Sequence, residues 1–155
     1  MNTFAQHVAD FIEGQGHKAE PHTEDGSSYT SLWFRTRGLN FAILVDEDDR
    51  SFLKLSCSHS LPECVIADAV AMDILLRAQD RIKCVKFSAL NDKRRLLCHV
   101  ELLLPDGVGL EAVFWRAVGM VEKAAREVHE ELRSIAPAKS AAEKFISQFT
   151  TGRAA

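Results

Sequence analysis

Three strand-like segments follow one another with very short connections, and this spacing restricts the fold more than any other feature of the sequence. They span residues 29–36, 39–45 and 51–57, and each is rich in aromatic or aliphatic residues. A parallel crossover needs a dozen residues or more, whereas these connections have two and five residues. The segments therefore predict an antiparallel meander, with Arg37 and Gly38 forming its first turn.

Three further segments have the apolar spacing of amphipathic helices. The first covers residues 3–14, and the second runs from Ser60 to about Asp80 after a capping-box pattern, Ser60 to Glu63. The third, residues 110–134, carries a regular apolar stripe opposite a charged face. Because proline lacks an amide hydrogen, Pro137 is expected to end this long helix.

A second hairpin is expected between the last two helices. Its strands cover residues 81–90 and 93–104, on either side of the turn pair Asn91-Asp92. Pairing across that turn sets Val85 opposite Cys98 and Phe87 opposite Leu96, which gathers apolar side chains on one face. Residues 17–28 are polar, contain Pro21 and Gly26, and are expected to form a loop.

The resulting order is helix, three-stranded antiparallel meander, helix, β-hairpin and long C-terminal helix, which is typical of the α+β class. The 155 residues suffice for one hydrophobic core. We therefore expect a single α+β domain over residues 1–136. Residues 137–155 form a C-terminal tail, either mobile or folded as a short docked helix with Phe145, Ile146 and Phe149 on its apolar side.

Composition and charge argue against several function classes. A formal net charge of −3 gives no electrostatic reason to expect nucleic acid as a partner. No apolar run approaches the roughly 20 residues that span a bilayer, so no membrane association is expected. The N-terminal residues lack the pattern of a signal peptide, which predicts a cytoplasmic protein. In that compartment the four cysteines are expected to be buried thiols.

Two clusters resemble metal sites. Cys57, His59 and Cys64 are soft ligands, but structural zinc normally has four protein ligands. The fourth would have to come from the sheet, and His99, Cys84 and Cys98 are the candidates. The acidic turn at residues 46–50 lacks the glycine and glutamate of a calcium loop, and we expect it to be solvated. No cofactor is expected, with Cys57, His59 and Cys64 kept as weak metal candidates.

Enzyme motifs are absent or lack their structural context. Residues 107–112 match a dinucleotide fingerprint, yet the preceding strand belongs to an antiparallel hairpin and no parallel strand follows. The sequence contains no G-x-S-x-G elbow, and its histidines have no neighbouring nucleophile motif. The sequence therefore favours a protein that is not an enzyme.

Apolar residues exceed what one sheet face and one helix stripe require. Between Cys64 and Leu76 the only charged residues are Asp68 and Asp73, and the middle strands are apolar on both sides. Either the chain covers these surfaces itself, or a protein partner does, with a homodimer as the preferred form. The predicted contact residues are Trp33, Phe34, Phe41, Ile43, Leu97 and Leu103.

Two stretches carry a resemblance to a known family. FAILVDEDDRSFLKLSC and CHVELLLPDGVGLEAVFWRAVGMVEKAAREVHEELRSI, in this element order, resemble the type III secretion chaperone-like fold. The likeness covers roughly residues 3–135 and is nearest to the YbjN-like branch, described as putative bacterial sensory transduction regulators. The resemblance implies a small, non-catalytic and often dimeric bacterial protein.

Together these features predict a non-catalytic protein-binding module, chaperone-like or regulatory. One alternative is a ligand- or metal-responsive sensor domain. Another is a type III secretion chaperone, which would hold an extended segment of its effector client against an apolar groove.

Overall fold

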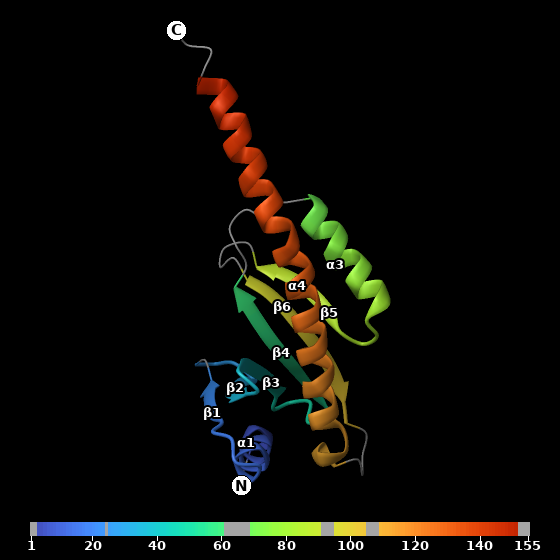
Figure 1. Cartoon of the computed structure of the whole chain (residues 1–155). Coiled ribbons are helices and arrows are strands. Elements are labelled where there is room, and N and C mark those ends of the chain that lie inside the picture. The colour runs from blue at the N-terminus through green and yellow to red at the C-terminus, as the bar shows by residue number, and fades with distance from the viewer. Residues whose placement is uncertain (1–2, 24, 61–68, 91–94, 105–108, 152–155) are drawn as a thin grey trace.

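The structure is a computed structural model that describes residues 3–23, 25–60, 69–90, 95–104 and 109–151 (Figure 1). Its centre is a six-stranded, fully antiparallel sheet with strand order β1-β2-β3-β4-β6-β5. The expected α+β class is confirmed. The strands are β1 (Glu20–Thr23), β2 (Tyr29–Thr36), β3 (Leu39–Asp46), β4 (Phe52–Ser60), β5 (Lys86–Leu90) and β6 (Arg95–Leu103).

The described helices pack on the same face of this sheet. They are α1 (Phe4–Gly14), α3 (Ala69–Arg81) and α4 (Leu110–Thr151). Helix α4 crosses β4 and β6, α3 lies beside α4 near β5, and α1 covers the end formed by β1, β2 and β3 (Figure 1).

The core lies between the helices and this face of the sheet. Burial alternates along the strands, as a half-covered sheet requires. Phe114 of α4 sits at its centre, with ring centroids 5.4 Å from Phe11 and 5.8 Å from Phe34. The largest fully buried side chains are Phe41, Phe114, Ile12, Leu32, Ile43, Leu53, Leu55, Leu96, Leu132, Val8 and Val45.

The start of α1 is tied to the turn between β3 and β4. The hydroxyl of Thr3 accepts a hydrogen bond from the Gln6 amide, while the carboxylate of Glu47 accepts from the amides of Phe4 and Ala5, both at 2.9 Å. These amides have no partner within the helix, and a carboxylate there also suits the helix dipole. The acidic turn is therefore not merely solvated, because Glu47 caps α1.

Two strand boundaries differ from the sequence-based predictions. Residues 17–28 were expected to be a loop, but Glu20–Thr23 pair with β2 as an exposed edge strand that accommodates Pro21. Ser60 was expected to cap a helix, but it is the last residue of β4 and pairs with Arg95. Residues 61–68, which include Glu63 and Cys64, lie outside the described part of the chain.

The predicted register of the second hairpin is wrong by two residues. Cys98 faces Phe87 rather than Val85, and Leu96 faces Ala89 rather than Phe87. Side chains alternate with a period of two, so this shift leaves every residue on its expected face. The proposed turn, Asn91-Asp92, lies outside the described residues.

The prediction that Pro137 ends the long helix is also wrong. Helix α4 continues from Leu110 to Thr151, and its last turns extend beyond the sheet (Figure 1). An interior proline costs a helix about 3 kcal/mol, but the neighbouring sequence is rich in alanine, the best helix former. Residues 137–151 thus belong to α4 rather than to a separate tail.

Among the helices that the structure describes, none is long and apolar enough to cross a membrane.

Candidate functional site

The opposite face of the sheet is not covered by any helix of the described chain (Figure 1). Large apolar side chains are exposed on it, with Trp33 50%, Tyr29 46% and Leu103 72% accessible. We call this surface the open face. Exposed aromatic and aliphatic side chains on an uncovered sheet are typical of surfaces that contact other proteins.

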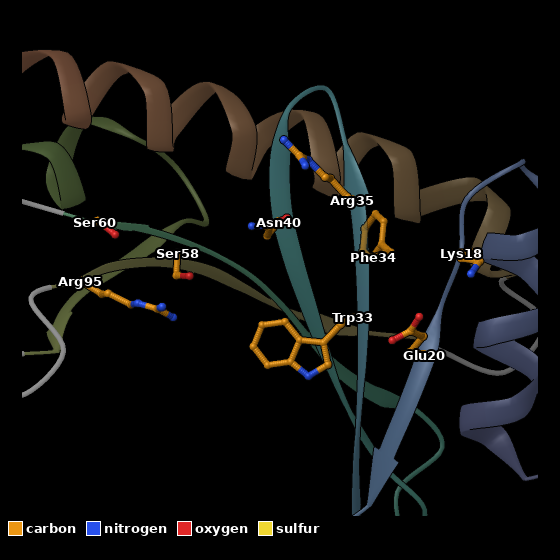
Figure 2. A pocket seen from close by; sticks show the side chains of 9 residues that line it. All are labelled: Lys18, Glu20, Trp33, Phe34, Arg35, Asn40, Ser58, Ser60 and Arg95. Carbon is orange, nitrogen blue, oxygen red and sulfur yellow. The ribbon is translucent and has the colours of Figure 1, made fainter.

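A groove runs over the open face around Trp33. Two adjoining cavities of about 520 and 150 Å³ share Trp33, Asn40, Ser58 and Arg95, so they form one continuous depression. We call it the Trp33 groove. Figure 2 shows the residues of the larger cavity, with the Arg95 side chain extending towards the Trp33 indole. The lining residues are Lys18, Glu20, Trp33, Phe34, Arg35, Asn40, Ala42, Ser56, Ser58, Ser60, Arg95 and Leu97.

The groove forms because small side chains occupy the two central strands. Trp33 of β2 pairs with Ala42 of β3, which pairs with Ser56 of β4. The next open-face residue of β4, Ser58, pairs with Leu97 of β6. The larger side chains of β2 and β6 therefore make the walls, and the small ones of β3 and β4 make the floor.

The groove is lined by cations that have no acidic partner among the described residues. Arg35 and Arg95 are exposed, and neither makes an ion pair within the described chain. Lys18 lies at the same cavity, with Glu20 as the one acidic lining residue. The positive charge is confined to the groove, since the whole chain carries a formal net charge of −3.

Two other arginines of the described chain already have acidic partners. Arg37 binds Glu122 at 2.8 Å, which holds the pKa of that carboxyl below its usual value. Arg81 binds Glu127 and Glu131, both at 2.7 Å. Arg81 also lines a cavity of about 370 Å³ between α3 and α4, together with Lys83, Lys123 and Glu127.

The predicted contact residues separate into two groups. Trp33, Leu97 and Leu103 lie on the open face, and their role as protein contacts stays a prediction. Phe34, Phe41 and Ile43 are core residues beneath the helices, so their prediction as contact residues is corrected. Phe34 lines the rim of the groove, but its ring lies 5.3 Å from that of Phe41 on the buried side of β2 and β3.

Two of the weak metal candidates, Cys57 and His59, lie on the helix-covered face. Cys57 Sγ is 3.8 Å from His59 Nε2, and Cys98 is the neighbour of Cys57 on β6. Cys84 is exposed in the loop before β5, and His99 occupies a position on the open face. Within the described residues no three His, Cys, Asp or Glu side chains are placed to hold a metal ion; Cys64 lies outside them.

Burial also makes the thiols of Cys57 and Cys98 poor metal ligands. It raises the pKa of the Cys57 thiol to about 11 and that of Cys98 to about 12, so both remain protonated at neutral pH. Burial, His129 and Arg126 lower the pKa of His59, whose ring centroid lies 5.1 Å from that of His129. The thiols therefore behave as small apolar residues of the core.

Comparisons with known proteins establish the fold alone. No model of a known protein family matches the sequence, and no curated protein matches it. One similar solved structure is that of an uncharacterized protein from Methanothermobacter thermautotrophicus, at 12% identity and a TM-score of 0.62. The alignment covers 84% of this chain and 97% of that chain. The α+β arrangement thus occurs in a second protein.

The polar residues of the groove were missed by sequence reasoning. Arg35, Asn40, Ser58 and Arg95 belong to four different strands and have no common motif. The usable signal was strand alternation, which places Arg35 on the same face as Trp33. Alternation alone does not show which face of the sheet the helices leave uncovered. The site could therefore be recognised only from the structure.

Proposed function

We propose that the protein is a non-catalytic, cytoplasmic protein-binding module, chaperone-like or regulatory, whose contact surface is the open face. The observation that carries this proposal is Trp33, a half-exposed tryptophan on a sheet face that no described helix covers. Tryptophan is among the residues most enriched at energetically dominant contact positions. The Trp33 groove gives such a contact a defined place.

The sequence resemblance supports the same proposal. A YbjN-like protein of the type III secretion chaperone-like fold would be a bacterial regulator or chaperone without catalytic residues. A type III secretion chaperone for an effector is the narrower form of this function. A homodimer would use the same face, with a second copy as the partner.

Site-specific photo-crosslinking in bacterial cells tests the proposal. A photoreactive phenylalanine replaces Trp33 or Leu103 on the open face, and Leu76 or Gln79 on α3 as controls. We expect one discrete adduct from both open-face positions and none from the controls. Adducts from α3 alone, or none from the open face, would contradict the proposed surface.

The partner identified by crosslinking is then purified, and its affinity for the wild-type chain and for each variant is measured directly. Trp33→Ala should weaken binding at least about 30-fold, the equivalent of about 2 kcal/mol for a dominant contact residue. Leu76→Ala is the matched control, because Leu76 is also apolar and is 63% exposed, but lies on α3. Equal affinities of wild type and Trp33→Ala would remove Trp33 from the contact.

A further inference from the structure

We infer that the partner segment bound in the Trp33 groove is an acidic peptide in an extended conformation. Its carboxylates pair with Arg35 and Arg95, and an apolar side chain between them packs on the Trp33 indole. This inference rests on the proposed function and adds the chemistry of the partner.

The two arginines stand on opposite sides of the groove floor. Arg35 is on β2 and Arg95 on β6, with β3 and β4 between them. Three strand spacings across the sheet and an offset of two residues along the strands place their backbones roughly 16 Å apart, which an extended peptide spans with about five residues. Both belong to the same lining as Trp33 (Figure 2). The expected motif is therefore two acidic residues about five positions apart with an apolar residue between.

The charge of the groove favours carboxylates over a neutral peptide. Within the described chain Arg35 and Arg95 have no ion pair, so binding an acid breaks no existing salt bridge. A guanidinium presents a planar fork of donors that matches a carboxylate. Asn40 and Ser58 add uncharged polar groups on the floor, which suit the amides of a peptide backbone.

The rest of the open face favours a peptide over a nucleic acid. Of the two aromatic residues in the described lining, Phe34 is buried and stacked on Phe41, so Trp33 alone exposes its ring, whereas binding of single strands uses a series of stacking rings. Tyr29, at the other end of β2, pairs with Asp46. Glu20, the acidic residue of the groove lining, pairs with Trp33. These acids would repel a phosphate backbone that continued along the sheet.

Selection from a display library tests the inference with the full chain. Random twelve-residue peptides on phage are panned against the immobilised wild type and, in parallel, against an Arg35→Ala/Arg95→Ala variant. Peptides enriched on the wild type alone should contain Asp or Glu on both sides of an apolar residue. Arg116→Ala/Arg133→Ala is the matched control, because both residues are exposed cations of α4.

Fluorescence anisotropy with one enriched synthetic peptide then measures the contribution of each group. We expect binding to weaken at least about tenfold in the Arg35/Arg95 variant and to be unchanged in the α4 control, equivalent to about 1.4 kcal/mol. Raising NaCl from about 50 to about 300 mM should weaken binding to the wild type, because salt screens exposed charges. Circular dichroism and thermal unfolding of each variant verify that the fold is intact.

The possible outcomes separate this inference from the proposed function. Peptides that need Trp33 but neither acids nor the two arginines would overturn the acidic motif and leave the protein-binding function in place. If no peptide depends on Trp33, both fail. Tighter binding of a ten-nucleotide oligouridine through the same residues, or self-association that is lost in Trp33→Ala, would assign the groove to nucleic acid or to a second copy and overturn the inference.

Discussion

The two faces of the sheet have the same backbone pairing but different relations to the helices. On the helix-covered face, Phe41, Ile43 and Leu55 have no accessible surface. On the open face, the neighbouring positions hold Ala42 and Ser56, with Trp33 exposed beside them. Hydrophobic burial therefore supports the fold from one side only, and the other side is free to contact a partner.

The largest effect on stability is expected when one aromatic residue from each face is replaced by alanine. Phe41→Ala should lower the free energy of unfolding by about 3–5 kcal/mol, because it removes a fully buried ring from the core. Trp33→Ala should lower it by less than about 1 kcal/mol, because half of the indole is already solvated. Urea denaturation measures both, and equal losses would show that the open face also contributes a core.

The attachment of α1 to the covered face provides a second test. Glu47→Ala removes the acceptor of two amides at the start of α1 and should cost about 1–2 kcal/mol. Asp48→Ala, at the exposed neighbouring position, should have little effect. Chemical denaturation of both variants makes the comparison. If Glu47→Ala left the free energy of unfolding unchanged, water would have replaced the carboxylate as acceptor at no cost.

A smaller effect concerns the half-buried imidazole of His59 on the covered face. Burial is the main reason that the pKa of His59 lies below its ordinary value of 6.5, so the unfolded chain binds a proton more readily than the folded chain. The contribution of His59 to the free energy of unfolding is fully present above pH 6.5, where the imidazole is neutral in both states. It is lost as the pH falls through the pKa of the folded state. His59→Gln should therefore reduce the loss of stability on acidification.

Urea midpoints at about pH 7.5 and about pH 5.5 bracket the ordinary histidine pKa and measure this loss. The pKa of His99 on the open face is lowered in the same direction, first by burial and then by Lys54, so part of the loss should persist in His59→Gln. An unchanged pH dependence in that variant would assign the whole effect to other groups.

The smallest expected effect comes from an ion pair of the open face. Lys86 binds Glu101 at 2.6 Å, but both side chains are exposed. Surface pairs of this kind contribute little to stability. Lys86→Ala should leave the unfolding midpoint within experimental error of the wild type. A loss as large as that of Glu47→Ala would indicate that this edge of the sheet is shielded from solvent.

The sequence predicted the elements whose signal is periodic. The expected bounds of β2 are those observed, and the predicted start of α4 at Leu110 is correct. The edge strand β1 was missed because all four of its residues are exposed, so no alternation marks it. Pro137 was misread because its local effect was weighed without the helix-forming residues around it.

The site was less predictable than the fold. Alternation divides residues such as Phe41 and Ala42 between two faces, but it does not say which face the helices will cover. For that reason Phe34, Phe41 and Ile43 were predicted as contacts although they are core residues. The arginines of the groove are sixty positions apart in the chain, and only the pairing of β4 with β6 brings them to one surface.

That pairing also has a kinetic consequence. The strands β1 to β4 follow one another as neighbours, and β5 with β6 is a local hairpin, so both units are closed by short loops. The seam between β4 and β6 joins residues about 40 positions apart, and its loop closure carries a larger entropic cost. Truncations along the seam, such as Val100→Ala opposite Leu55, should therefore slow refolding, while those in β1 should mainly accelerate unfolding.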